Sequence, residues 1–582
     1  MTPAKLGWDV GGGGTAVITV QAPTGNAATD TAAISAAIAA AVTAAPATVV
    51  LPVGQYALSG RLLISGPGVT IRGQGYGTVL KWSANDSNPG IESVGNDDVH
   101  ISDMSIIGSR PAGDVTTLTS HHGILIGNAN CCSVRRCRVD GWNGHGILFA
   151  GYDDRSPGLT WTQGVWDSWI EDNYVTGTNI GIMIFNDCRR VICSGNVTTK
   201  LVSVGIMTDD SHVVGGTEVA RECVGIVVTG NQVSWTKGAG IAIAGTQESI
   251  VSDNYICDTG RYPTTPTSTY SPGISLQSVQ NLIVCKRNIV SNNVVTRCSH
   301  YGIALTGCTD NIVRGNYVFN NSYDRASGGV ANIYLLKSTI SSVDYGSSRN
   351  VIEGNFVDDD STTSTVGSQI QIADPACVGN VIRNNYTVGG GSATKVMDAG
   401  VQTVIEGNTG YLLPGTAYGT GVAATESGNG TLHKTLLKLT NVAITLTDQG
   451  AAGSGYLQIY GFAAGAIKLV GATIDITTAT SGLADGYSVD CALGTAFAAA
   501  DGTLTGTEAN LVPSITAAVA TNAIAHKGKS GATEESQASF DGMAGANTVK
   551  VYLNFASAAD PVGNKTLTVS GTVRLHWINL GP

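Results

Sequence analysis

One short signature recurs along the middle of the chain, between residues 171 and 408. It reads EDNYV, SGNVT, TGNQV, SDNYI, SNNVV, RGNYV, EGNFV, RNNYT and EGNTG. The last Asn of successive copies is 23, 35, 23, 39, 23, 39, 30 and 23 positions further on, so a unit of 23 residues recurs and the longer units carry inserted loops. A period of this kind predicts a solenoid. The recurring residues are Asn173, Asn196, Asn231, Asn254, Asn293, Asn316, Asn355, Asn385 and Asn408.

A second phrase, Gly-Ile-x-hydrophobic, alternates with the first. Within residues 300–321, Ile303 and Leu305 alternate with small or polar residues, as in a strand with one buried face. Two more short strands follow at Ile312 and Tyr317, and the Asn between them lies at a bend. Asn tolerates left-handed backbone there and can bond the Asn above and below. We therefore interpret the Asn series as a structural ladder in an all-β, right-handed parallel β-helix with coils about 4.8 Å apart.

An Ala-rich segment precedes the first strands. Residues 28–45 predict a helix that is capped by Thr29 or Asp30 and is followed by Pro46. This capping helix would cover the open apolar end of the first coil, because an uncovered strand edge invites aggregation.

Three segments at this end of the chain carry a family resemblance: DTAAISAAI (30–38), VLPVGQY (50–56) and GVTIRGQG (68–75). In them the chain resembles the pectate-lyase-like β-helix superfamily, over residues 28–410. The resemblance implies the right-handed parallel β-helix fold. It implies no single activity, because the superfamily includes lyases, hydrolases, epimerases and virus tailspikes.

The repeat ends at Asn408. Residues 411–431 are rich in Gly, Ala and Thr and predict a linker, and residues 432–582 alternate like the strands of an antiparallel β-sandwich. This last part resembles the jelly-roll-like C-terminal domain of phage fibre and virion proteins, in residues 493–514 and 551–581. The resemblance implies a bacteriophage tailspike or tail fibre, generally a homotrimer, in which this domain serves trimerisation or receptor binding.

Composition limits the partners and the location. The 582 residues carry a formal net charge of -11 and no apolar run long enough to span a membrane, so we expect no nucleic-acid partner and no membrane insertion. The N-terminus lacks a secretory pattern, which favours assembly in the host cytoplasm and a final place in the virion tail, acting at the host cell surface. Residues 1–27 read equally well as a segment that attaches to other virion tail proteins or as a disordered start.

The twelve cysteines show neither a CxxC pair nor a His at zinc spacing. We expect reduced thiols packed inside the coils, no metal site and no cofactor.

Carboxylates gather in the loops that follow neighbouring Gly-Ile strands. One rung is about 4.8 Å and two are about 10 Å, separations that bracket those of retaining and inverting glycosidases. Like charges on successive rungs would raise one pKa, leaving one group protonated as the acid and one ionised as the base or nucleophile. The candidate catalytic residues are Asp153, Asp154, Asp187, Asp209 and Asp210.

Aromatic and basic residues in the same loops offer apolar faces to sugar rings and charges to polar groups. The candidate substrate-binding residues are Trp142, His145, Tyr152, Arg155, Trp161, Trp166, His212, Trp235 and Lys237. Both sets have a structural alternative, because Asp commonly caps turns and Trp in a long loop often packs that loop down.

The sequence thus favours a tailspike that binds host capsular polysaccharide or lipopolysaccharide and depolymerises it by glycoside hydrolysis. Two alternatives stay open. One is a non-catalytic receptor-binding or structural fibre. The other is a polysaccharide lyase, in which a base and a cation act on a uronic acid and the candidates are His145, His212, Lys237, Arg261 and Tyr262.

Overall fold

The structure is a computed structural model. Its described residues form two compact units, a coiled solenoid and a C-terminal β domain, divided between Val381 and Val404. No helix among them is long and apolar enough to cross a membrane. The described residues are 16–83, 88–110, 121–151, 163–210, 213–214, 217–218, 221–262, 271–278, 284–322, 330–340, 342–358, 366–387, 396–408, 415–428, 432–462, 466–481, 487–499, 502–519, 524–525, 539–541 and 550–579.

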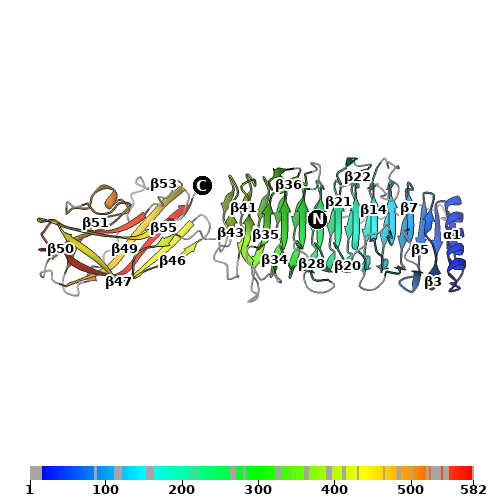
Figure 1. Ribbon diagram of the computed structural model, residues 1–582, viewed down its shortest axis with the longest axis horizontal. Coiled ribbons are helices and arrows are strands. Elements are labelled where there is room, and N and C mark those ends of the chain that lie inside the picture. The colour runs from blue at the N-terminus through cyan, green and yellow to red at the C-terminus, as the bar shows by residue number, and fades with distance from the viewer. Residues whose placement is uncertain are drawn as a thin grey trace. The chain divides into compact units, whose positions relative to one another are not determined.

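The helix α1 (Ala27–Thr43) packs across the first coil, with Ile34 and Ile38 buried (Figure 1). Its N-cap is Asn26, whose side chain accepts from the backbone N–H of Thr29, rather than Thr29 or Asp30 as the sequence suggested. Asp30 is buried instead. Burial opposes its charge, but hydrogen bonds from Thr24, Ala57 and Gly25 outweigh that effect and hold the pKa of Asp30 below its ordinary value.

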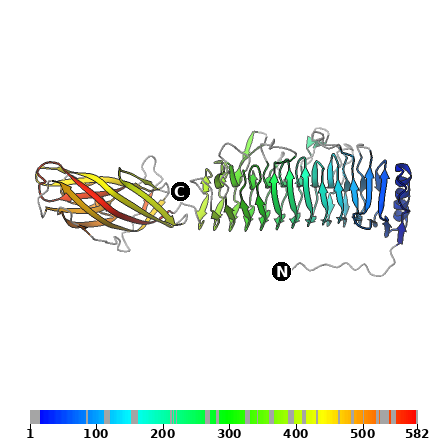
Figure 2. The ribbon, with the colours of Figure 1, turned by 90° about the horizontal axis from the view of Figure 1, so that it is seen from below.

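Three parallel sheets make up the solenoid, and each coil contributes one strand to each sheet in chain order (Figures 1 and 2). Sheet A contains β1 (Ala16–Thr19), β2 (Ala47–Val50), β5 (Val69–Arg72), β8 (His100–Ser102), β12 (Ser133–Arg135), β16 (Trp169–Glu171), β19 (Ile192–Ser194), β24 (Val227–Thr229), β27 (Ile250–Ser252), β30 (Ile289–Ser291), β33 (Ile312–Arg314), β38 (Val351–Glu353), β41 (Val381–Arg383) and β44 (Val404–Glu406).

Sheet B contains β3 (Gly54–Leu58), β6 (Thr78–Trp82), β9 (Ser105–Ile107), β13 (Arg138–Asp140), β17 (Tyr174–Thr176), β20 (Val197–Leu201), β25 (Gln232–Thr236), β28 (Tyr255–Thr259), β31 (Val294–Thr296), β34 (Tyr317–Phe319), β39 (Phe356–Asp358) and β42 (Tyr386–Thr387). Sheet C contains β4 (Leu62–Ile64), β7 (Ile91–Val94), β10 (Ile124–Gly127), β14 (His145–Ala150), β18 (Ile180–Phe185), β21 (Ile206–Asp209), β26 (Ile241–Ala244), β29 (Ile274–Gln277), β32 (Ile303–Thr306), β35 (Val330–Leu336), β40 (Val366–Ile372) and β43 (Val396–Asp398). This topology confirms the right-handed parallel β-helix.

The recurring Asn residues lie at the bend between sheets A and B, and all nine are buried. Asn196, for example, donates its backbone N–H to the side-chain oxygen of Asn231 at 2.9 Å and its side-chain amide to the same oxygen at 3.0 Å. Its amide also donates to the carbonyl of Ile170 at 2.8 Å. Each such Asn therefore satisfies backbone groups that the bend would otherwise bury without partners.

A second Asn column, which the sequence analysis did not identify, lies just before sheet A. In Asn288, Asn311 and Asn350 the backbone N–H and the side-chain amide both donate to the side-chain oxygen of the next Asn at 2.9 to 3.1 Å. Its members all lie five residues before a member of the first column: Asn288, Asn311, Asn350 and Asn380.

The glycine of the Gly-Ile phrase is explained by close approach between coils. A Cβ added at Gly181 would lie 2.5 Å from the carbonyl oxygen of Gly205, and one at Gly205 would lie 2.5 Å from that of Gly240. Because these contacts involve backbone on the next coil, any larger side chain would force the coils apart.

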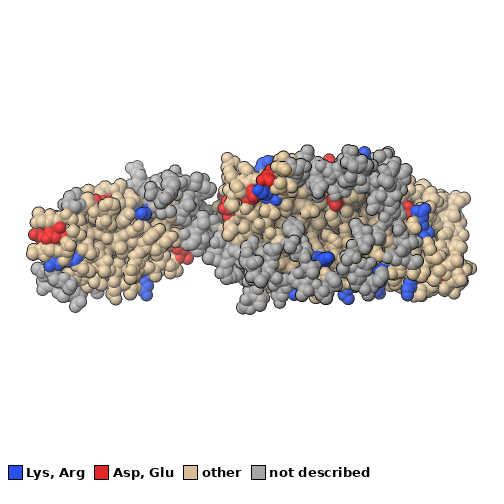
Figure 3. All heavy atoms as spheres, in the orientation of Figure 1, with Lys and Arg blue, Asp and Glu red and all other residues tan. Residues whose placement is uncertain are grey.

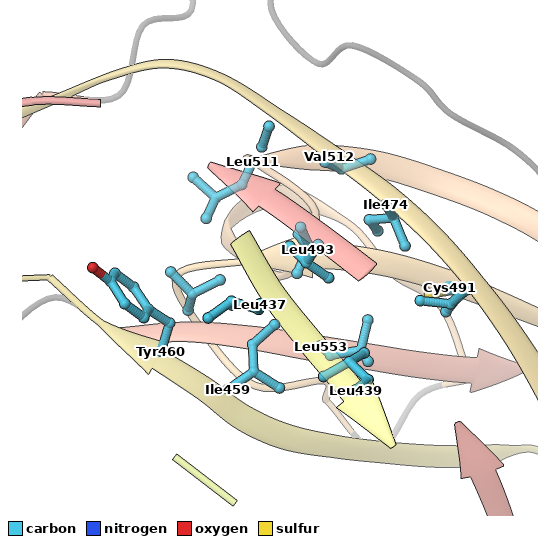
Figure 4. Close-up of a cluster of buried hydrophobic side chains, with 14 of the residues drawn as sticks. Leu437, Leu439, Ile459, Tyr460, Ile474, Cys491, Leu493, Leu511, Val512 and Leu553 are labelled. Carbon is cyan, nitrogen blue, oxygen red and sulfur yellow. The ribbon is translucent and has the colours of Figure 1, made fainter. Parts of the chain in front are cut away.

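The C-terminal domain is an antiparallel sheet that curls around its own core (Figure 2). Figure 4 shows part of that core, with Leu437, Ile459 and Leu553 pointing toward one another. The elements are β45 (Thr416–Ala417), β46 (Val422–Gly428), β47 (Leu432–Asp448), β48 (Gly453–Gly461), β49 (Ala466–Ser481), β50 (Tyr487–Gly494), the 3-10 helix η1 (Gly506–Glu508), β51 (Val512–Val519), β52 (Ile524–Ala525), β53 (Ser539–Asp541), β54 (Lys550–Ser557) and β55 (Lys565–Asn579).

Part of the expected linker, residues 411–431, belongs to this domain. β45 pairs with β48, and β46 pairs along its whole length with β47. The side chain of Glu426 in β46 accepts hydrogen bonds from Tyr460 and from the backbone of Gly415. Gly- and Ala-rich composition suggested a linker, but alternation in residues 422–428 is enough to form an edge strand once a long partner strand is present.

Candidate functional site

The residues predicted to act on a glycan separate onto the two sides of sheet C. Asp187, Asp209 and Asp210 lie at the turn that leads from sheet C to sheet A, together with Trp166. His145, Trp235 and Lys237 lie at the opposite side, where the chain enters sheet C from sheet B. A strand of four to six residues, about 13–20 Å, separates the two groups.

Asp187 lies two residues after β18 and is nearly buried. Its Oδ1 accepts from Arg189 Nε at 2.9 Å, and its Oδ2 lies 3.6 Å from Arg221 Nη1. The backbone of Asp187 has a φ of 53° and donates its N–H to the carbonyl of Arg221 on the next coil. The carboxylate of Asp187 thus lies against two guanidinium groups at this turn.

Asp209 ends β21 in register with Phe185, one rung beyond β18. It is half-buried, and its Oδ1 accepts from the backbone N–H of Asp210 at 2.8 Å. Asp210 is fully buried, and its carboxylate occupies the space beside Gly245. A Cβ at Gly245 would lie within 2.3 Å of all three carboxylate atoms. In this conformation Asp209 is therefore more accessible to a ligand than Asp210 is.

Trp166 ends the short strand β15 (Val165–Trp166) and braces the same turn. Its indole N–H donates to the carbonyl of Asp187 at 2.9 Å, and the guanidinium carbon of Arg189 lies 5.4 Å from the ring centroid. The ring is half-buried. Trp166 and Arg189 thus both contact Asp187, and Arg189 also contacts the Trp166 ring. A ligand that moved the ring would therefore also disturb the contacts of Asp187.

His145 pairs with His122 across one rung. Their Nδ1 atoms are 3.0 Å apart and the rings are stacked with centroids 4.7 Å apart. The backbone N–H of His145 also donates to His122 Nδ1, which makes that nitrogen an acceptor and His145 Nδ1 a donor. Burial lowers the pKa of His145 to about 4, so the ring is neutral at neutral pH and is a weak base.

Trp142, predicted to contact sugar, is a core side chain. It is completely buried, donates its indole N–H to the carbonyl of Ile106 at 3.2 Å and packs against Trp82 and His121. No face of its ring is open to a sugar. Burial here was not visible in the sequence, because the GWNGH segment has no strand periodicity.

Trp235 is exposed and lies at the left-handed corner between sheets B and C, with a φ of 52°. Its neighbours on the adjacent rungs are Lys200 and Asp258. Lys237 is half-buried and bonds through its backbone to Leu201. The structure therefore does not bring Trp235 or Lys237 to the acidic turn.

Between the two sides, the outer face of sheet C carries an apolar column. Leu125, Leu148, Met183 and Met207 occupy successive rungs in register. The first three are almost completely buried and form one cluster with Ile180. This buried apolar column, which we call the apolar floor of the candidate groove, thus lies between the carboxylates on one side and the His122–His145 pair on the other.

Several predicted residues lie outside the described part of the chain: Tyr152, Asp153, Asp154, Arg155, Trp161 and His212. Residues 1–15 of the predicted attachment segment lie outside it as well. Within the described residues there is no cluster of His, Cys, Asp or Glu arranged to hold a metal ion.

Charged side chains are sparse on the surface shown in Figure 3. Many of those on the solenoid are paired between coils, such as Asp167 with Arg190 at 2.6 Å and Asp310 with Arg349 at 2.8 Å. In both pairs the hydrogen bond from the Arg is the main cause that lowers the pKa of the Asp.

Comparison with known proteins supports the fold. A model of the family described as the right-handed β-helix region matches residues 170–340. No curated protein sequence matches the chain significantly. Among solved structures, the Dettilon tailspike protein is 14% identical over 97% of this chain and 94% of its own, with a TM-score of 0.50.

Two further structures share less of the arrangement. Tailspike protein 3 of bacteriophage CBA120 is 12% identical over 68% of this chain and 62% of its own, with a TM-score of 0.46. The A-module of the Azotobacter vinelandii mannuronan C-5 epimerase AlgE4 is 17% identical over 67% of this chain and 96% of its own, with a TM-score of 0.43. At these identities the likeness concerns the fold, and the chemistry has to be argued from the residues.

Proposed function

We propose that the protein is a phage tailspike that binds a host-surface polysaccharide along sheet C and hydrolyses its glycosidic bonds. The observation that carries the proposal is the placement of Asp187 and Asp209 at one turn, on neighbouring rungs, beside Trp166 and an apolar floor. Support for the tailspike class comes from the fold shared with the Dettilon tailspike and from the C-terminal resemblance to phage virion domains.

The two carboxylates would have different roles. Asp187, which contacts Arg189 and Arg221, would act as nucleophile or as the base that activates water. Asp209, on the neighbouring rung, would be the proton donor to the leaving oxygen. Trp166 would place its ring against a sugar.

A lyase is less well supported. Its base would have to accept a carbon-bound proton at neutral pH, and His145 binds protons too weakly for that role. Arg261 is engaged by Asp258 at 3.2 Å and so is poorly placed to neutralise a substrate carboxylate. The non-catalytic fibre is the second candidate, because the apolar floor would serve a binding groove equally well.

The purified full chain would be incubated with capsular polysaccharide and with lipopolysaccharide. New reducing ends are the expected result, and they identify a hydrolase. Absorbance from unsaturated sugars would identify a lyase, and retention of the glycan without cleavage would identify a binder. Absence of both binding and cleavage would contradict the proposal.

We also propose a homotrimer, attached through its N-terminal segment to other tail proteins. The support is the tailspike class, together with the need to cover the last coil of a solenoid.

A further inference from the structure

A column of exposed aromatic rings runs along the outer face of sheet B, away from the candidate groove on sheet C. The residue that follows each ladder Asn from Asn173 to Asn385 begins a sheet B strand. Apart from Tyr386, which belongs to the other compact unit, it is aromatic in four coils: Tyr174, Tyr255, Tyr317 and Phe356. The three tyrosines are 36%, 41% and 40% exposed. We call these four residues the sheet B stripe.

Strand register fixes the spacing along the stripe. Tyr174 pairs with Val197, which pairs with Gln232, which pairs with Tyr255. From Tyr255, two further rungs lead through Val294 to Tyr317. Tyr174 and Tyr255 are therefore three rungs, about 14 Å, apart. Tyr255 and Tyr317 are two rungs, about 10 Å, apart, a spacing comparable to the length of an extended disaccharide unit.

The N-terminal end of the stripe is an open pocket of about 410 Å³. Tyr76 and Tyr174 line it, with Arg138, Asp172 and Val197 between or beside them. Tyr76 is 52% exposed. Its backbone carbonyl accepts a hydrogen bond from the hydroxyl of Ser105, which pairs with Arg138 on the next strand of sheet B. The volume of the pocket lies within the range of about 300–1,000 Å³ that is usual for small-molecule sites. Two tyrosine rings with a cation and a carboxylate beside them suit a sugar ring, which has apolar faces and polar edges.

Small hydroxyl side chains accompany the rings along the neighbouring column of the same face. Thr176, Thr199 and Ser234 lie in register on successive strands, and the Ser234 hydroxyl donates to Thr199 Oγ1 at 3.1 Å. Further along, the rings of Tyr317 and Phe356 lie 4.6 Å apart. The stripe therefore offers ring faces with small hydroxyl groups beside them at Thr199 and Ser234, and with the Phe319 ring beside Tyr317.

The exposed area argues against a second protein as the occupant. About two-fifths of a tyrosine side chain, which buries about 150–250 Å² when fully covered, leaves about 60–100 Å² for each ring. Five rings, Tyr76 included, offer about 300–500 Å², whereas a stable protein interface buries about 800 Å² on each partner. The stripe is narrow and one ring wide, which fits a linear polymer better than a folded surface.

We propose that the pocket and the sheet B stripe form a second polysaccharide site, which binds an extended glycan lying along the solenoid axis and is separate from the sheet C groove. The choice of a polysaccharide as the ligand rests on the proposed function, whereas the location of the site at the pocket and the sheet B stripe does not. The site would hold the polymer near the protein while the groove engages another part of it, which raises the effective concentration of the substrate.

The test begins with the wild-type full chain on an array of bacterial capsular and O-antigen polysaccharides. For a polysaccharide that binds, affinity is then measured for the wild type, the double variant Tyr255→Ala/Tyr317→Ala and the pocket variant Tyr76→Ala. Tyr418→Ala is the matched control, because Tyr418 is 38% exposed in the C-terminal domain and lies outside the stripe. Oligosaccharides of increasing length from the same polysaccharide would complete the series.

We expect the double variant to bind at least about tenfold more weakly, while Tyr418→Ala stays within about twofold of the wild type. Affinity of the wild type should rise with oligosaccharide length, and the double variant should lose that rise. Unchanged binding by both the double variant and the pocket variant would overturn the inference and leave the proposed function standing. Loss of subunit association with glycan affinity intact would make the stripe a contact between copies of the chain and would also overturn it. If the wild type binds no polysaccharide, the inference and the proposed function fall together.

Discussion

Asn293 and Asn316 are 23 residues apart in the chain, yet Asn293 donates both its backbone N–H and its side-chain amide to the side-chain oxygen of Asn316, at 3.0 and 2.9 Å. Asn316 in turn donates to Asn355, 39 residues further on, at 3.0 and 2.9 Å. The contact geometry is the same although the second coil is longer by 16 residues. The ladder therefore depends on the bend and not on the length of the loops.

Replacing Asn316 with Leu should lower the free energy of unfolding by about 1–3 kcal/mol. The substitution removes the acceptor for two donors of Asn293 and buries a side chain that cannot replace it. Chemical denaturation would measure the change. Gln232→Leu, at an exposed carboxamide on sheet B, is the control and should change stability by less than about 0.5 kcal/mol. Loss of glycan binding without loss of stability would contradict the structural role.

Asp187→Asn and Asp209→Asn should each lower the turnover of a cleaved polysaccharide at least about a hundredfold, the usual scale for a lost acid or base. Reducing-end release at saturating substrate would measure it, with glycan binding retained. Asp310→Asn is the matched control, since Asp310 is paired with Arg349 at another corner of the solenoid. If both groove variants keep full activity, the catalytic site lies elsewhere.

The stability of the solenoid should depend on pH through Asp258, which contacts Arg297 at 2.8 Å. Burial opposes the charge of Asp258, but hydrogen bonds from Arg297, Cys257 and Arg261 and the charge of Arg297 outweigh it and lower its pKa. A lowered pKa means that the folded state binds this proton less tightly than the unfolded state. The stabilisation is therefore complete above about pH 4, the ordinary pKa of Asp, and is lost as the pH falls through the lower, folded-state pKa.

Thermal midpoints of the wild type and Asp258→Asn, taken from pH 6 to pH 2, would check this. The wild type should lose more stability than the variant over that range. Asp253→Asn, at an exposed turn that is also left-handed, controls for the loss of a carboxylate as such. Parallel curves for the wild type and Asp258→Asn would contradict the argument.

The thiols should distinguish the folded chain sharply from the unfolded one. Of the twelve free cysteines, Cys131 is exposed and the other eleven are buried. Burial raises the pKa of Cys137 and of Cys298 to about 12, so these thiols are neither accessible nor ionised at neutral pH. A thiol reagent should modify one cysteine per native chain and twelve in denaturant, counted by mass spectrometry, and Cys131→Ser should remove the native reaction. Rapid modification of several native cysteines would contradict the packing.

Sedimentation of the full chain should give the mass of a trimer. Removal of residues 409–582 should leave a folded solenoid that assembles poorly, because repeat stability comes largely from neighbouring coils. The cut belongs after Asn408 because β46 (Val422–Gly428) pairs with β47 in the C-terminal domain. A clean monomer of the full chain at micromolar concentration would contradict the trimer.

The solenoid could be predicted because its period is written directly in the sequence. The Asn at the bend, the Gly at the close approach and the alternating Ile and Val residues each recur at a fixed place. The second Asn column also has a sequence pattern, an Asn followed by two hydrophobic residues, five residues before Asn293, Asn316, Asn355 and Asn385. This pattern is shorter and less distinctive than the first signature.

The site was less predictable because it lies in the parts of each coil that do not repeat. Asp187 was expected among the catalytic carboxylates, but its two arginines come from the same turn and from the next coil, a pairing that spacing alone does not specify. Trp142 lies in a segment whose composition is that of a loop, but its side chain is completely buried in the core. The helix cap at Asn26 was not predicted, because Asn26, Thr29 and Asp30 all have side chains that can cap a helix.

The constant geometry of the ladder has a consequence for how this chain can diversify. Asn231 and Asn254 are 23 residues apart and Asn254 and Asn293 are 39 apart, yet the corresponding hydrogen bonds are 2.9 and 3.1 Å long. A coil can therefore gain or lose a loop beside sheet C while its neighbours keep their positions. Surface loops could be exchanged one coil at a time, with no redesign of the scaffold that carries them.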